Sequence, residues 1–124
     1  MNKQLTTLRT ADELAAAGLI APDDRSAIQA VSQRYAVAIT PTVAALIDRD
    51  DATDPIARQF VPSAAEMRVA KDERADPIGD LVHAPLKGIV HRYPDRVLLK
   101  LANVCPVYCR FCFRRESVGK GEDA

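Results

Sequence analysis

All three cysteines of the chain lie in one eight-residue run, CPVYCRFC from Cys105 to Cys112, with the spacing C-x3-C-x2-C. An odd number of cysteines in a single cluster argues against a fold held by disulfides. Thiolates three and four positions apart on one loop can instead surround one metal centre, and iron–sulfur clusters are held by cysteines in such runs. The fold is therefore expected to present this loop to a metal.

The cysteine run directly follows a β-prone segment, VLLKLA at residues 97–102. This segment is nearly continuous in apolar residues, which predicts a strand buried on both faces in a parallel sheet. A second β-prone run, Ile89–Tyr93, precedes it, and Pro94-Asp95 between them predicts a hairpin or a sharp turn. Ligands of α/β sheets and barrels lie at the carboxyl ends of strands, so a site is expected at the cysteines.

Residues 1–75 have the pattern of a helical region, and turn formers become frequent after Arg74. Thr10 followed by Glu13 predicts a helix start, Gly18 predicts its end, and Thr40-Pro41 predicts another start. The expected fold class is α/β, with a helical region at 1–75 and the start of a second domain at 76–124. The predicted buried positions are Ile28, Val31, Tyr35 and Ala38 in one helix, and Val43, Ala44, Leu46 and Ile47 in the next.

Composition and charge narrow the class of protein. Hydrophobic residues make up 48% of the 124, and no apolar stretch approaches the ~20 residues that span a bilayer. A long apolar segment is also missing after the first basic residues, so a cytoplasmic protein with reduced thiols is expected. Residues 87–120 carry eight Lys or Arg against two acids, a difference of +6. This block suits anionic ligands, and without a dense Lys/Arg run it does not favour nucleic acid.

The cysteines leave a choice of metal. Structural zinc usually has four protein ligands, so a zinc site would need His83 or His91 in addition. A cubane iron–sulfur cluster held by three cysteines has one iron without a protein ligand, and that iron can bind a small molecule. A small zinc-binding or nucleic-acid-binding module thus stands as the alternative to an iron–sulfur protein.

With Phe111 in the aromatic place, C-x3-C-x-aromatic-C resembles the signature of the radical S-adenosylmethionine superfamily. The flanking sequence narrows the resemblance. DPIGDLVHAPLKGIVHRYPDRVLLKLANVCPVYCRFCFRRESVG, residues 76–119, looks like the lysine 2,3-aminomutase family. The fold that this resemblance implies is a (β/α) partial barrel, of which residues 76–124 would supply the first strand and the cluster loop.

The resemblance also implies an activity and its cofactors. Members of the family bind a [4Fe-4S] cluster, S-adenosylmethionine and pyridoxal 5′-phosphate. They move the amino group of an amino acid, such as lysine, from C2 to C3. Glutamate is the alternative substrate, and a close rival in the same superfamily acts in the β-lysylation of elongation factor P.

Carried over by motif, the resemblance assigns seven positions of this chain. Arg92 and Arg96 in HRYPDR match arginines that hold the cofactor phosphate, although they could instead be solvated or pair with Asp95. Arg114 matches the arginine that binds the substrate carboxylate, with an ordinary charged helix start as the alternative. A planar guanidinium suits bidentate pairing with a phosphate or a carboxylate. The cluster ligands would be Cys105, Cys109 and Cys112, and Phe111 would lie near the adenine of S-adenosylmethionine.

The family's remaining site residues lie later in the chain than any position here. They include the lysine that binds pyridoxal phosphate covalently, a role not given to Lys87, Lys100 or Lys120. A complete parallel barrel needs about 200 residues or more. The chain is therefore expected to be a truncated or split product, a gene remnant, or one that pairs with a missing C-terminal chain. It is expected to be inactive alone, while the complete protein could form a homo-oligomer.

Overall fold

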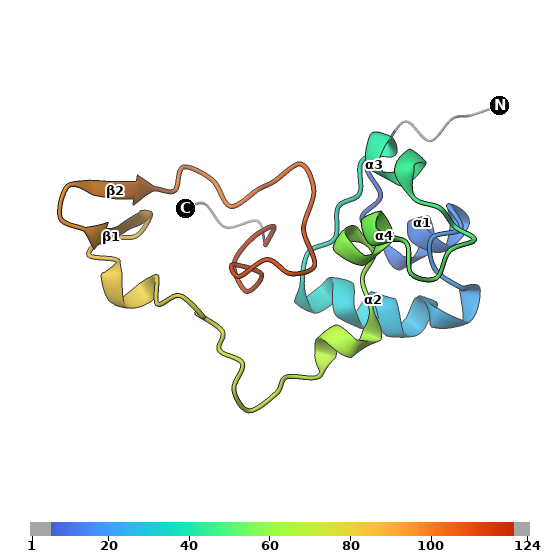
Figure 1. The fold of residues 1–124 in the computed structure, drawn as a ribbon, viewed down its shortest axis with the longest axis horizontal. Coiled ribbons are helices and arrows are strands. Elements are labelled where there is room, and N and C mark those ends of the chain that lie inside the picture. The colour runs from blue at the N-terminus through green and yellow to red at the C-terminus, as the bar shows by residue number, and fades with distance from the viewer. Residues whose placement is uncertain (1–5, 121–124) are drawn as a thin grey trace.

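The computed structural model describes residues 6–120 and places the helices in the first part of the chain and a hairpin in the second (Figure 1). The helices are α1 (Ala11–Ala16), α2 (Arg25–Arg34), α3 (Pro41–Leu46) and α4 (Pro55–Phe60). Short 3₁₀ turns lie at Pro22–Asp24, Ala64–Met67 and Leu81–His83. The strands are β1 (Ile89–Tyr93) and β2 (Arg96–Leu99).

Local sequence signals set the ends of the helices, as predicted. The Thr10 side chain accepts a hydrogen bond from the backbone N–H of Glu13 at 3.2 Å and so caps α1. Helix α1 ends at Gly18, which has φ +73°, a conformation that costs glycine little. There the backbone N–H groups of Gly18 and Leu19 donate to the carbonyls of Ala15 and Leu14, each at 3.0 Å. These two hydrogen bonds satisfy carbonyl groups that the end of the helix leaves without a partner.

The core lies among the helices. Leu8 and Ile39 pair across an isolated antiparallel bridge, and both are fully buried with Leu14 and Val31. Ile28, Val31, Tyr35 and Ala38 are all buried as predicted, but α2 ends at Arg34, so Tyr35 and Ala38 lie beyond the helix and not on its apolar face. In the next predicted helix Ala44 and Ile47 are buried and Val43 is partly buried, but the prediction is wrong for Leu46, which is the last residue of α3 and is 64% exposed.

The hairpin expected around Pro94-Asp95 is confirmed, but the buried parallel strand is not. β1 and β2 pair antiparallel, with Ile89 opposite Leu99 and Val90 opposite Leu98. Every residue of β2 is exposed, and only Val90 of β1 is buried. The physical reason is that no second layer covers the hairpin within residues 6–120, so its apolar side chains face solvent. The structure thus shows mixed helix and sheet, with one two-stranded antiparallel sheet among the described residues.

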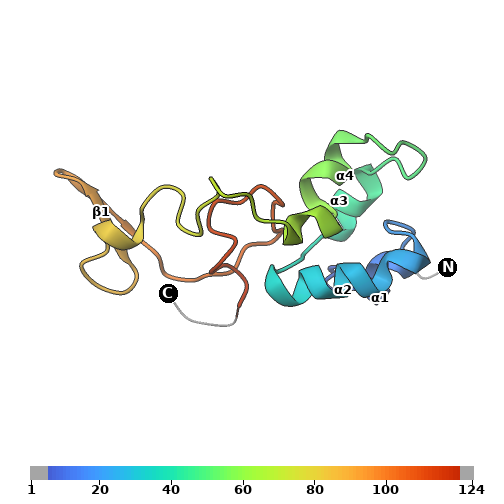
Figure 2. The same ribbon diagram turned by 90° about the horizontal axis from the view of Figure 1, so that it is seen from below.

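The cysteine run lies between the helices and the hairpin. Both views place residues 101–120 in the middle of the molecule, in a compact loop without regular helix or strand (Figures 1 and 2). An extended segment after the 3₁₀ turn at Ala64–Met67 leads to the hairpin (Figure 1). Its residues Asp72, Glu73 and Arg74 line a pocket together with the cysteine loop. In the part of the chain that is described, no helix is long and apolar enough to cross a lipid bilayer.

Candidate functional site

The cysteine loop is fixed at its centre by Tyr108. This tyrosine is buried, and its backbone N–H donates to the carbonyl of Ala38 at 3.3 Å. Its hydroxyl accepts a hydrogen bond from the backbone N–H of Cys105 at 3.4 Å. Within the loop, the N–H of Cys112 donates to the carbonyl of Cys109 at 3.1 Å. Tyr108 therefore organises the first cysteine turn, rather than only packing against it.

Arg110, between the second and third cysteines, ties the loop to the helical region. Its guanidinium donates to both carboxylate oxygens of Glu66, with a shortest distance of 2.7 Å, and to the carbonyl of Ala36 at 2.7 Å. Its backbone N–H donates to the carbonyl of Gln59, also at 2.7 Å. The Arg110 and Glu66 side chains are only 8% and 13% exposed. A buried, bidentate ion pair of this kind holds the loop in one orientation.

The thiols themselves are free and are not gathered together. Cys105 is exposed, whereas Cys109 and Cys112 are partly buried. Among residues 6–120, no group of three or more His, Cys, Asp or Glu side chains is arranged to hold a metal ion. Three free thiols fit the donor chemistry of an iron–sulfur cluster, but their arrangement here does not fit a bound one. Neither His83 nor His91 forms such a group with the cysteines in this part of the chain.

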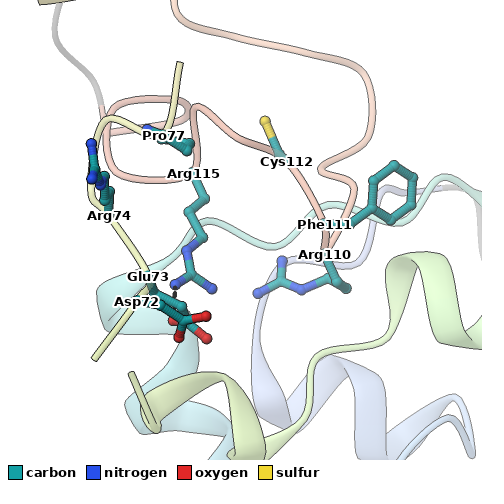
Figure 3. A pocket seen from close by; sticks show the side chains of 8 residues that line it. All are labelled: Asp72, Glu73, Arg74, Pro77, Arg110, Phe111, Cys112 and Arg115. Carbon is teal, nitrogen blue, oxygen red and sulfur yellow. Dashed lines mark ion pairs between the residues drawn. The ribbon is translucent and has the colours of Figure 1, made fainter. Parts of the chain in front are cut away.

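A pocket of about 410 Å³ adjoins the last cysteine. It is lined by Cys112 and Phe111, by Arg110 and Arg115, and by charged residues of the extended segment around Glu73. Figure 3 shows Arg115 reaching toward Asp72 and Glu73, while the ring of Phe111 points away from them. Arg115 forms a 3.5 Å ion pair with Glu73. The predicted adenine residue, Phe111, is thus 70% exposed at the edge of a pocket that carries both signs of charge.

The three arginines assigned from the family motif come together at the hairpin. Arg92 lies on β1, Arg96 begins β2, and Arg114 comes from the cysteine loop. One pocket of about 330 Å³ contains them all. Its lining residues are Ile78, Asp80, Val90, Arg92, Tyr93, Arg96, Val97, Leu98 and Arg114. Three guanidiniums around one pocket fit the binding of phosphate or carboxylate groups.

Asp80 is the single acid that lines this pocket in the described part of the chain. It is only 9% exposed, and its carboxylate accepts from Arg114 Nε at 2.9 Å and from Arg92 Nη2 at 3.4 Å. Arg92 also donates to the carbonyl of Ile78. Arg96 lies further out, where it pairs with exposed Asp95 at 3.5 Å and stacks on the Tyr93 ring at 4.3 Å. The expected Asp95 pairing is therefore found for Arg96, whereas Arg92 pairs with Asp80.

Asp76 holds the turn that presents Asp80. One Asp76 carboxylate oxygen accepts from the backbone N–H of Asp80 at 2.9 Å, and the other accepts from that of Leu81 at 2.8 Å. The hydrogen bond from Leu81 lowers the pKa of Asp76 most, and the one from Asp80 and the nearby charges of Arg92 and Lys100 lower it further. Each of these interactions favours the ionised form of the carboxyl group.

Three residues of the site were not predicted from the sequence. Asp80 and Glu66 were not singled out, and Arg110 was part of the motif without a role of its own. Glu66 and Arg110 are 44 positions apart, so no local pattern joins them. The one available signal was the pair of acids, Asp76 and Asp80, in the turn-rich segment before the two motif arginines.

Sequence similarity runs along almost the whole chain. The chain is 34% identical over 117 residues to the L-lysine 2,3-aminomutase of Clostridium subterminale, and the match covers 94% of this chain and 28% of that protein. It is 37% identical over 118 residues to the L-lysine 2,3-aminomutase of Bacillus subtilis, covering 94% of this chain and 25% of the relative. The chain belongs to the lysine 2,3-aminomutase family. It spans about a quarter of the length of these curated relatives.

One similar protein is named for another amino acid. A glutamate 2,3-aminomutase of Clostridioides difficile is 35% identical over 97 residues, which cover 78% of this chain and 23% of that protein. A search against protein-family profiles found no match. The similarity therefore covers almost all of this chain but only about a quarter of each relative.

Proposed function

We propose that this chain forms the cluster-loop portion of an amino acid 2,3-aminomutase, with lysine as the substrate. The observation that carries the proposal is the meeting of Arg92, Arg96 and Arg114 in one pocket. The family motif assigns them to a phosphate and a carboxylate, and they come from two strands and a loop. Lysine is proposed over glutamate because the longest matches, over 94% of the chain, are to lysine enzymes of Clostridium subterminale and Bacillus subtilis, while the glutamate enzyme matches 78%.

In this proposal the arginines divide two tasks. Arg92 and Arg96 hold the phosphate of pyridoxal 5′-phosphate, and Arg114 binds the carboxylate of the amino acid. The three cysteines hold a [4Fe-4S] cluster, and Phe111 lies beside the adenine of S-adenosylmethionine. When bound, these groups supply radical chemistry and a carrier for the migrating amino group. The thiols are not gathered in the structure, so the loop has to rearrange when a cluster binds.

The proposal extends to the fold and the setting of the protein. Residues 76–124 form the start of a radical S-adenosylmethionine partial barrel in the cytoplasm, where thiols stay reduced. Since the chain spans about a quarter of the relatives' length, further residues complete the site. We therefore expect no β-lysine when the purified chain is incubated anaerobically with lysine, reductant and all three cofactors. β-Lysine in this assay would contradict the need for further residues.

Anaerobic reconstitution tests cluster binding directly. The purified chain, incubated with iron, sulfide and a thiol reductant, is expected to turn brown and to bind iron and sulfide in equal amounts. Cys105→Ser, Cys109→Ser and Cys112→Ser should each lose most of the visible absorption. Val104→Ser, a change to serine at an exposed neighbour of the run, is the matched control and should keep it. A colourless chain that instead binds one equivalent of zinc through the same cysteines would overturn the proposal.

A further inference from the structure

The pocket at the hairpin contains more positive than negative charge. Three guanidiniums line it, and the carboxylate of Asp80 is the acid that faces them in residues 6–120. Asp80 is 9% exposed, so its charge is little screened by water. Nothing in the family motif assigns a role to this residue.

Asp80 stands between two of the arginines. Its Oδ2 accepts from Arg114 and its Oδ1 accepts from Arg92, at 2.9 and 3.4 Å. Each carboxylate oxygen thus holds one guanidinium. Arg96 belongs to the same hairpin as Arg92 and lines the same pocket.

The backbone fixes the carboxylate in this place. Asp76 binds the backbone N–H groups of Asp80 and Leu81, which locks the turn before the short helix at Leu81–His83. Arg92 also donates to the carbonyl of Ile78 in the same turn. The acid is therefore presented by a rigid turn and not by a freely rotating surface side chain.

We infer that Asp80 is a positioning residue that divides the pocket into two anion positions, one at Arg92 and Arg96 and one at Arg114. Without its carboxylate, all three guanidiniums can converge on one anion. With it, a ligand that carries a phosphate at one end and a carboxylate at the other binds better than a ligand with a phosphate alone. The inference rests on the proposed function and adds a residue that selects between ligands.

The test compares two stable probes. The reduced adduct of pyridoxal phosphate with lysine carries a phosphate and a carboxylate, whereas pyridoxamine 5′-phosphate carries the phosphate alone. Calorimetric titration of the chain gives the ratio of the two affinities. We expect Asp80→Asn to reduce this ratio by about tenfold, since a charge-assisted contact to Arg114 is lost. Pyridoxamine 5′-phosphate should bind at least as tightly as before, because the pocket has lost a negative charge.

Two further variants serve as controls. Asp95→Asn makes the same chemical change at an exposed acid paired with Arg96, and it should leave the ratio unchanged. Asp80→Glu keeps the charge and should restore most of the preference. An unfolded fraction lowers both affinities by the same factor, so the ratio reports on folded protein only.

The outcomes separate the inference from the proposed function. If the unmodified chain binds neither probe, the cofactor pocket of the proposed function is wrong, and the inference is overturned with it. If the chain prefers the two-anion probe and Asp80→Asn keeps that preference, only the role of Asp80 is overturned. Equal weakening of both probes, or loss of all binding, in Asp80→Asn would mark Asp80 as structural and would also overturn the inference.

Discussion

Gly119, near the end of the cysteine loop, packs tightly against Ala36 and Tyr108. Its φ is +71°, and a Cβ added there would lie 2.5 Å from the Cβ of Ala36 and 2.7 Å from Cζ of Tyr108. Its backbone N–H donates to the carbonyl of Asn103 at 2.6 Å, which closes the loop on itself. Only glycine satisfies both the backbone conformation and this close approach.

Gly119→Ala should therefore lower the free energy of unfolding by about 2–4 kcal/mol, from backbone strain and overpacking together. Gly79→Ala is the matched control, because Gly79 also has φ +71° but its added Cβ would meet only Val82, at 3.4 Å. That variant should lose only the strain, about 1–2 kcal/mol. Urea unfolding of both variants measures the difference. Equal losses would show that the contact with Ala36 and Tyr108 carries no cost.

At Asp76, the prediction concerns pH. The pKa of this carboxyl is lowered from its ordinary value of 3.8 by hydrogen bonds from Leu81 and Asp80. A group with a lowered pKa in the folded state stabilises the fold above its unfolded pKa, and that stabilisation is lost as pH falls through the folded pKa. Unfolding curves between about pH 2 and 6 should show a steeper loss of stability at the acid end for the native chain than for Asp76→Asn. Parallel profiles would contradict the prediction.

At the scale of elements, the Arg110–Glu66 pair joins the cysteine loop to the 3₁₀ turn at Ala64–Met67. Glu66→Gln leaves a buried guanidinium without its counter-ion, which should cost about 3 kcal/mol of stability. It should also speed tryptic cleavage at Arg114 and Arg115 in the loop. Asp12→Asn breaks an exposed pair with Arg25 at 3.9 Å, and it should cost less than about 1 kcal/mol. If both variants resist trypsin equally, the pair does not hold the loop.

Elements whose ends depend on neighbouring residues were predictable from the sequence. Thr10, Gly18 and Thr40 set helix ends through hydrogen bonds within a few positions, and each lies where the pattern placed it. Leu46 was placed wrongly, because the sequence gives no sign of how short α3 is. The strand predicted at residues 97–102 is found in part, as Arg96–Leu99, and its composition shows only that it favours burial. Whether a second layer covers it depends on residues elsewhere.

The candidate site was predictable in part for the same reason. The motif singled out the cysteines and the arginines, and the structure brings Arg92, Arg96 and Arg114 together. Asp80 and Glu66 act on residues 34 and 44 positions away, so their roles follow only from three-dimensional contacts. The cluster, nucleotide and cofactor assignments remain predictions. The cysteine spacing gives donor chemistry and not the positions of the thiols.

At the scale of the whole molecule, apolar surface gathers at the hairpin end. Leu99 and Leu101 are exposed there, as are Leu81, Val82 and Leu86 on the preceding segment. Open strand edges beside exposed apolar side chains favour pairing with another chain. We expect the chain to self-associate as its concentration rises, measured by sedimentation velocity. The double variant Leu99→Lys/Leu101→Lys should suppress association, whereas Leu46→Lys, at the exposed last residue of α3, should not. If Leu46→Lys suppresses association as strongly as the hairpin variant does, the hairpin is not the interface.

The anchoring of the cysteine loop also sets an order of folding. Tyr108, Arg110 and Gly119 meet partners at Ala36 and Ala38, about seventy to eighty positions earlier in the chain. Closing so long a loop costs entropy, so the helices are expected to form first and to wait for it. On the ribosome, the thiols would therefore emerge before their anchoring glycine does. During that interval the cysteines are open to oxidants and to iron, and the redox state of the cell at synthesis decides which reaches them first.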